Sequence, residues 1–120
     1  MPLAKTSPDY GTNVMVAGVE IRATDAAIAI NNGAVVITKA SIAALTLALP
    51  TAGTDDGKVL RIFATTAYSH TITTPALGVN GANTIITLVS SPPAAGNGVK
   101  LLAYNGSWWV QGGINNTVSG

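Results

Sequence analysis

The fold is decided most clearly by the stretch VKLLAYNGSWWVQG, residues 99–112. Asn105-Gly106 is the strongest short signal for a two-residue type I′ hairpin turn. Such a turn places Tyr104 opposite Ser107 and Leu102 opposite Trp109, and opposite residues share a face of the sheet. One face is then wholly apolar and is predicted to be core: Val99, Leu101, Ala103, Trp108 and Val110. The other face carries Lys100, Leu102, Tyr104, Ser107, Trp109 and Gln111.

The two adjacent tryptophans are predicted to lie on opposite faces of the sheet. Trp108 belongs to the core face, whereas Leu102, Tyr104 and Trp109 form a mixed patch typical of a subunit or partner interface. Exposed aromatic rings also stack on sugars, so a carbohydrate-binding module that uses Trp109 and Tyr104 is an alternative. The interface is favoured because burial rewards Leu102, and a sugar site would bring carboxylates and amides close to the rings.

Applied to Asn32-Gly33, the same turn logic predicts a second hairpin. Its core face would be Ile28, Ile30, Val35 and Ile37, and its other face Ala27, Ala29, Ala34, Val36 and Thr38. Short alternating segments separated by Gly, Asn, Asp and Pro continue through the chain and predict strands. Their expected ranges are 14–22, 27–31, 34–38, 45–49, 58–64, 69–74, 84–89, 99–104 and 107–112.

Helical periodicity is nearly missing, and only residues 39–44 could make a helical turn. A chain of 120 residues suits one domain that needs no disulfide or metal to fold. The sequence therefore predicts an all-β, single-domain protein, an antiparallel β-sandwich over residues 14–113. We expect an extended N-terminal arm before it, residues 1–13, and a polar C-terminal tail after it, residues 114–120.

Charge is scarce: 9% of residues are charged, against roughly 25% in an ordinary soluble domain. No charged residue occurs between Arg61 and Lys100. A surface that gives up charge but keeps Thr, Ser and Asn favours contact with other protein subunits. The basic residues are dispersed, so nucleic acid is not an expected partner.

The most apolar run, residues 40–49, is too short to span a membrane. No signal-peptide pattern precedes it, so we expect a protein made in the cytoplasm.

Catalytic and metal-binding patterns are thin. His70 is the only histidine and is predicted to be structural, because an imidazole in a Thr-rich strand commonly hydrogen-bonds hydroxyls and no carboxylate partner is identifiable. The five acidic residues suggest no paired acid and base, and cysteine is absent. Asp55-Asp56-Gly57 lacks the spaced ligands of a calcium loop and is predicted to be a turn. The sequence thus favours a protein that is not an enzyme and holds no metal or cofactor.

Four segments together resemble the small head-fibre and capsid decoration (cement) proteins of tailed bacteriophages. They are residues 36–40, residues 44–58, the run His70-Thr71-Ile72-Thr73, and the hairpin from Ala103 to Val110. This resemblance implies a homotrimeric jelly-roll or tulip-like β-domain on the virion, at the capsid exterior, where it contacts the major capsid protein. A tail-fibre or spike module is the nearest alternative.

The arm is the candidate capsid-facing grip within this interpretation. Pro2 and Pro8 discourage strand pairing, and Tyr10 is its one large side chain able to anchor in a pocket. A merely frayed terminus is an equally weighted alternative.

Overall fold

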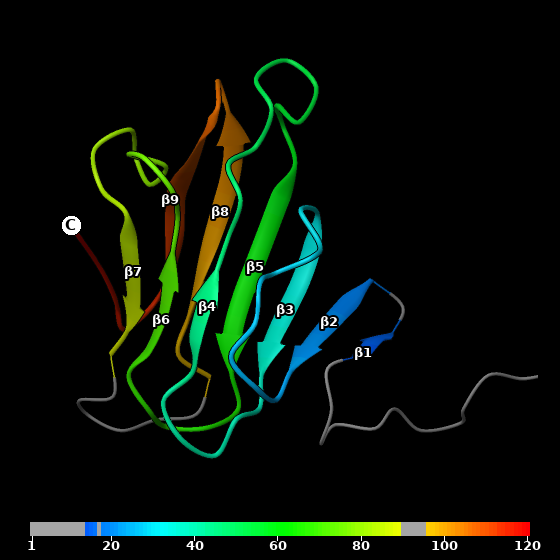
Figure 1. Ribbon diagram of the computed structural model, residues 1–120, viewed down its shortest axis with the longest axis vertical. Coiled ribbons are helices and arrows are strands. Elements are labelled where there is room, and N and C mark those ends of the chain that lie inside the picture. The colour runs from blue at the N-terminus through cyan, green and yellow to red at the C-terminus, as the bar shows by residue number, and fades with distance from the viewer. Residues whose placement is uncertain (1–13, 17, 90–95) are drawn as a thin grey trace, which may run out of the picture.

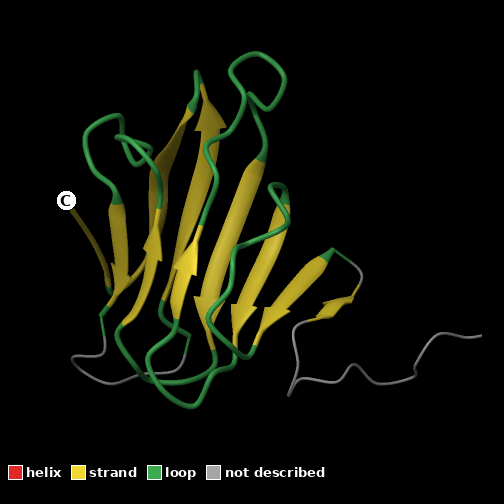
Figure 2. Cartoon of the chain, in the orientation of Figure 1, coloured by secondary structure: helices red, strands yellow, loops and turns green. Residues whose placement is uncertain are grey.

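The computed structural model describes residues 14–16, 18–89 and 96–120, and within them the fold is all-β without a helix (Figures 1 and 2). The strands are β1 (Val14–Val16), β2 (Val19–Arg22), β3 (Gly33–Ile37), β4 (Ala44–Thr46), β5 (Val59–Ala64), β6 (His70–Thr73), β7 (Ile85–Leu88), β8 (Gly98–Tyr104), β9 (Ser107–Ile114) and β10 (Asn116–Ser119). The expected arm, with Pro2, Pro8 and Tyr10, lies outside the described residues. Residues 39–43, where a helical turn was possible, are irregular backbone that leads into β4.

The strands form two sheets that face each other around one core. A six-stranded sheet has the order β1-β2-β3-β5-β8-β9, and a four-stranded sheet has the order β10-β7-β6-β4. The prediction of purely antiparallel sheets was wrong, because β2–β3, β3–β5 and β4–β6 pair in parallel. Parallel neighbours need long connections, and here the chain crosses from one sheet toward the other between successive parallel strands.

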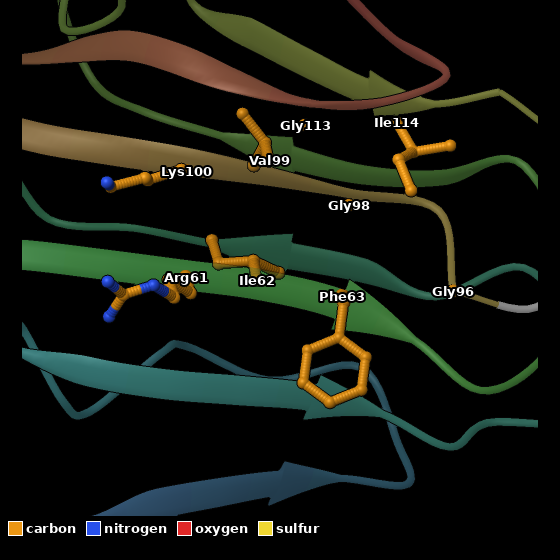
Figure 3. A pocket seen from close by; sticks show the side chains of 9 residues that line it. All are labelled: Arg61, Ile62, Phe63, Gly96, Gly98, Val99, Lys100, Gly113 and Ile114. Atoms are coloured by element: carbon orange, nitrogen blue, oxygen red, sulfur yellow. The ribbon is translucent and has the colours of Figure 1, made fainter.

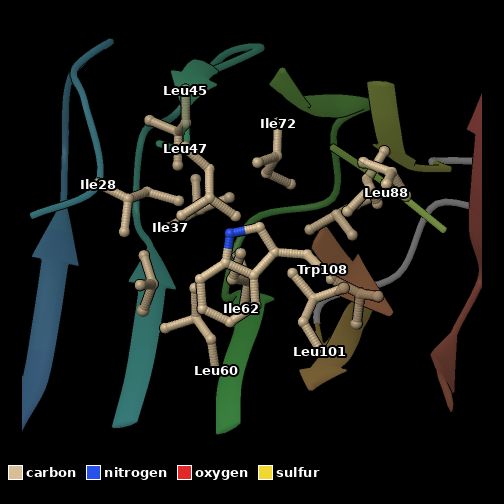
Figure 4. Close-up of a cluster of buried hydrophobic side chains, with 14 of the residues drawn as sticks. Ile28, Ile37, Leu45, Leu47, Leu60, Ile62, Ile72, Leu88, Leu101 and Trp108 are labelled. Atoms are coloured by element: carbon tan, nitrogen blue, oxygen red, sulfur yellow. The ribbon is translucent and has the colours of Figure 1, made fainter. Parts of the chain in front are cut away.

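Side chains from both sheets fill the space between them (Figure 4). Trp108 is fully buried and reaches across the interior, where its indole Nε1–H donates to the Ala48 carbonyl at 2.9 Å. Around it pack aliphatic residues that alternate along their strands, among them Leu45, Leu60, Ile62, Ile72, Leu88 and Leu101. The predicted core face of the C-terminal hairpin is confirmed: Val99, Leu101, Ala103 and Trp108 are buried, and Val110 packs against them.

The C-terminal hairpin has the predicted register. Tyr104 pairs with Ser107, Ala103 with Trp108, Leu102 with Trp109 and Leu101 with Val110. Asn105 and Gly106 both have positive φ, 51° and 82°, as a type I′ turn requires. A bulge between Lys100 and Leu101 then shifts the pairing farther along the hairpin.

The predicted hairpin at Asn32-Gly33 was wrong, although its core face was not. Residues 27–31 form no strand beside β3; instead the Ile28 amide donates to the Thr46 carbonyl at 2.8 Å, and so lies along β4. Gly33 begins β3, which lies between the parallel strands β2 and β5. Ile28, Val35 and Ile37 are nevertheless buried, and Ile30 packs against them, because the apolar pattern fixes which side chains are inward whatever the strand's partner.

A buried carboxylate holds residues 26–31 in this position. Glu20 is 1% exposed, and its Oε1 accepts the Ala29 and Ile30 amides at 2.9 and 2.8 Å. Its Oε2 pairs with the Arg22 guanidinium at 2.5 Å, and Arg22 donates to the Ala27 carbonyl. The carboxylate therefore satisfies backbone donors that a neighbouring strand would otherwise satisfy.

Two sheet edges are covered by irregular segments. Residues 26–28 lie against β4, as described above. Along β9, the Trp108 amide donates to the Gly78 carbonyl at 2.7 Å, and the Asn80 amide donates to the Trp108 carbonyl at 2.9 Å. The Asn80 side chain continues this cover by accepting the Val110 amide at 2.9 Å.

The expected polar tail was also wrong. After a turn at Asn115, whose φ is 49°, residues 116–119 form β10 and pair with β7 in the opposite sheet. Val118 packs against the core, so a single inward apolar residue on a short polar strand completes the four-stranded sheet. The sequence analysis missed this strand because polar residues surround that one valine.

Candidate interaction surface

The outer face of the six-stranded sheet is built from rows of side chains that run across the strands. Strand register aligns Val59 with Leu102 and Trp109 in the first row. The second row aligns Arg61 with Lys100 and Gly112, and the third aligns Phe63 with Gly98 and Ile114. An apolar row thus lies on each side of a row with two cations, on one nearly continuous surface.

The predicted interface residues Leu102, Tyr104 and Trp109 lie on this face. Tyr104 is 58% exposed, whereas Leu102 and Trp109 are half-buried. The Trp109 indole N–H donates to the Tyr104 carbonyl at 2.9 Å, and the ring lies near Gly81, where an added Cβ would be 3.6 Å from Cη2. Trp109 is therefore held within the protein, and its N–H is already used, which makes it less suited to hydrogen-bond a sugar.

A shallow apolar hollow lies at the opposite end of the face (Figure 3). Phe63, 38% exposed, and Ile114, 61% exposed, flank it. Gly98 is in register with Phe63 and Ile114 and places no side chain in the hollow, where a Cβ would be 2.6 Å from the Ile62 carbonyl oxygen. Gly113 lets the two strands approach closely, because a Cβ there would be 2.1 Å from the Gly98 carbonyl oxygen. The sequence analysis missed this hollow; the adjacent Gly112 and Gly113 in a strand were its signal.

Cations lie in the middle row, between the two apolar rows. Arg61 on β5 is directly opposite Lys100 on β8, and both side chains are exposed. Figure 3 shows them at the same end of the hollow, away from Phe63 and Ile114. Within residues 14–16, 18–89 and 96–120, neither cation has an ion-pair partner.

The outer face of the four-stranded sheet is uncharged. Its outward side chains follow from strand register: Ala44, Thr46, Thr71, Thr73, Ile85, Thr87, Thr117 and Ser119. All of them except Ile85 are small, and they present hydroxyl and methyl groups. Such a surface suits close packing against another sheet or subunit.

His70 is buried, and both of its ring nitrogens are hydrogen-bonded within the chain. Its Nδ1 accepts the Ala43 amide at 3.0 Å, which places the ring proton on Nε2, 3.2 Å from the Thr66 carbonyl oxygen and 3.0 Å from its hydroxyl. Burial lowers the pKa of His70, so the neutral ring is favoured. The ring therefore connects the start of β4 to the loop before β6, as expected of a structural histidine that bonds a hydroxyl.

The Asp55-Asp56-Gly57 segment forms the predicted turn. Asp55 accepts the Thr51 amide at 2.7 Å and pairs with Lys58 at 2.7 Å; the Lys58 and Thr51 hydrogen bonds lower the pKa of Asp55. Asp56 accepts the Asn105 amide at 2.9 Å. Both carboxylates thus bind the chain itself. No group of three His, Cys, Asp or Glu side chains gathers anywhere in the described part of the chain.

The same described residues include no helix long and apolar enough to cross a membrane. Comparison of the chain with protein-family models, with curated proteins and with solved structures finds no match. The two sheet faces and their charges therefore remain the basis for a functional proposal.

Proposed function

We propose that this protein is a non-enzymatic structural component of a tailed-phage virion that binds the outer surface of the assembled capsid as a homotrimer. The observation that carries the proposal is the character of its two outer faces. The face of the four-stranded sheet has no charged side chain, and the other exposes Phe63, Tyr104 and Ile114. Exposed apolar side chains on one face are typical of protein interaction sites.

The distribution of polar groups supports a structural role over catalysis. His70, Glu20 and Asp55 are each hydrogen-bonded to backbone amides of this chain. A catalytic acid or base must reach a substrate proton, and these buried groups are occupied by the scaffold.

We assign the two faces to different partners. The Thr-rich face of the four-stranded sheet is flat and neutral, and is the proposed contact between copies in the trimer. The face with Leu102, Tyr104 and Trp109 is left for the major capsid protein. Parallel strand pairs favour a tulip-like arrangement over a jelly roll, whose strands are antiparallel.

Reinforcement would follow from mass action. Contacts that bridge neighbouring capsomers exist only in the assembled shell, so binding shifts the equilibrium against its rupture. The protein would be made in the host cytoplasm and act at the capsid exterior.

Two experiments test this proposal. Light scattering coupled to gel filtration should give three times the 12.0 kDa monomer mass at micromolar concentration. Mixing purified protein with undecorated capsids should give co-sedimentation that saturates. A mass that stays monomeric at every concentration, or capsids that sediment bare, would refute it.

The arm has a separate test. Deletion of residues 2–12, which contain Pro2, Pro8 and Tyr10, should leave the trimer intact but abolish capsid binding, because three arms act together through effective concentration. A truncated trimer that decorates capsids as tightly as the full chain would show that the arm is no grip.

A further inference from the structure

The charges of the described chain are divided unevenly between its surfaces. Ion pairs join Arg22 to Glu20, Lys39 to Asp25 and Lys58 to Asp55. The two cations that remain within the described ranges are Arg61 and Lys100, and they are adjacent. All the unpaired positive charge that the structure describes therefore lies at one place on the outer face of the six-stranded sheet.

This placement costs the isolated protein stability. Like charges directly opposite each other on antiparallel strands repel, and here no carboxylate of the described residues offsets the repulsion. Strand register fixes the two Cα positions, so only the flexible side chains can move apart. An arrangement that is unfavourable in the free chain becomes favourable when an anion binds both cations.

A second copy of the chain is poorly equipped to supply that anion. Glu20, Asp25 and Asp55 are already ion-paired within the described chain, which leaves Asp56 as its one side-chain carboxylate without such a pair. Nucleic acid is also a poor fit, because two cations are few for a phosphate backbone and apolar side chains flank them. A different protein with exposed carboxylates fits both charge and surroundings.

The hollow gives this partner a second requirement. Phe63 lies two residues from Arg61 along β5, and Ile114 lies two residues from Gly112, which pairs with Lys100. Each separation is about 6.6 Å along the strand. One side chain that enters the hollow would contact Phe63, Ile114 and the backbone at Gly98, which lines it. A carboxylate two residues away in an extended segment would lie on the same side, at about the distance of Arg61 and Lys100.

We propose that Arg61, Lys100 and the Phe63–Ile114 hollow bind an acidic segment of a partner protein, in which an apolar side chain lies beside one or two carboxylates. The inference rests on the proposed function for its partner, since it assigns this chemistry to the capsid surface. It adds the part of that face that docks, and the charge and shape of the surface that it meets.

Capsid co-sedimentation with matched variants tests the site. Arg61→Gln/Lys100→Gln should weaken binding about 10-fold at low salt, and the difference should shrink at high salt because screening already weakens the wild type. The exchanged pair Arg61→Lys/Lys100→Arg keeps both charges and should bind within about 3-fold of wild type. Equal salt dependence of the neutral variant and the wild type would overturn the charge assignment.

The hollow has its own matched pair of variants. Ile114→Ser should weaken capsid binding about 10-fold at every salt concentration, as loss of an apolar anchor does. Ile42, 56% exposed in the loop before β4, is the control, and Ile42→Ser should bind as wild type does. Equal effects of the two substitutions would overturn the role of the hollow.

A peptide titration separates this proposal from the proposed function. NMR titration of the isotope-labelled full chain with the peptide acetyl-Glu-Ala-Leu-Ala-Glu-amide should shift the amides of Arg61, Lys100 and Ile114, and the analogue with Gln in place of both Glu residues should not. If capsids fail to bind but these shifts occur, the docking chemistry stands and the proposed function fails. If capsids bind but the peptides act alike, the docking proposal fails. A neutral variant that loses the trimer would show that the face contacts another copy, and would also overturn it.

Discussion

Replacement of the buried Glu20 carboxylate by an amide should be among the most destabilising conservative changes in this chain. Glu20→Gln keeps the shape and one oxygen, which can still accept the Ala29 and Ile30 amides. The second oxygen becomes an NH₂ group that faces the Arg22 guanidinium, which now lacks its counter-charge. Breaking a buried pair on one side costs about 3–5 kcal/mol, and slight exposure of Arg22 argues for the lower end, about 3 kcal/mol.

Thermal and urea unfolding measure this loss. For a chain of this length about 3 kcal/mol corresponds to a fall in Tm of roughly 12 °C. Asp25→Asn is the control, because that carboxylate also has a cationic partner, Lys39, and also accepts a backbone amide. It is exposed, so the loss of stability should be far smaller. The double variant Glu20→Gln/Arg22→Gln should recover part of the stability, since it removes the unpaired cation.

The reasoning fails if Glu20→Gln unfolds within about 0.5 kcal/mol of wild type, the range of an ordinary surface substitution. That result would mean that residues 26–31 keep their place through Ile28 packing alone. If Glu20→Gln/Arg22→Gln is less stable than Glu20→Gln alone, the unpaired Arg22 is not the source of the lost stability, which would equally contradict the role given to Arg22.

Three further predictions concern the core, a titrating ring and the Thr-rich face. Trp108→Ala should cost about 3–5 kcal/mol in urea unfolding, whereas Trp109→Ala should spare the fold and weaken association; the reverse order would contradict the face assignment. Because burial lowers the pKa of His70 below its ordinary 6.5, its contribution to stability is complete above pH 6.5 and is lost as pH falls from 6.5 through the lowered pKa. His70→Gln should remove that decline from a pH series of unfolding midpoints. Thr73→Arg should dissociate the trimer in light scattering without a change in Tm of the protomer, and a trimer of unchanged mass would exclude this face as the contact.

Local patterns in the sequence predicted the parts of the fold that local chemistry determines. Asn105-Gly106 has few alternatives to a type I′ turn, so the register, the buried Trp108 and the outward Trp109 followed from it. The inward side chains around Val35 were also predicted correctly, because alternation depends on the strand and not on its partner.

Local sequence patterns could not show which strands pair with each other. Asn32-Gly33 has the composition of a hairpin turn, but Glu20 offers the segment before it a different set of hydrogen bonds, from a distance of nine residues or more. The same limit applies to the site. Leu102 and Trp109 were placed on one face by a local turn, whereas the opposition of Arg61 and Lys100 arises from pairing of strands almost forty residues apart.

The covered edges restrict how copies of this protein can accumulate. An open strand edge can recruit identical strands without limit, which is the route to fibrils, and a chain with so little charge has weak repulsion to stop it. Here residues 26–28 occupy the edge of β4, and residues 78–80 occupy that of β9. The other two edges are short strands, β1 with three residues and β10 with four, and short edge strands offer little template for a further strand. The chain can therefore remain poor in charge without polymerising through the edges of β4 and β9.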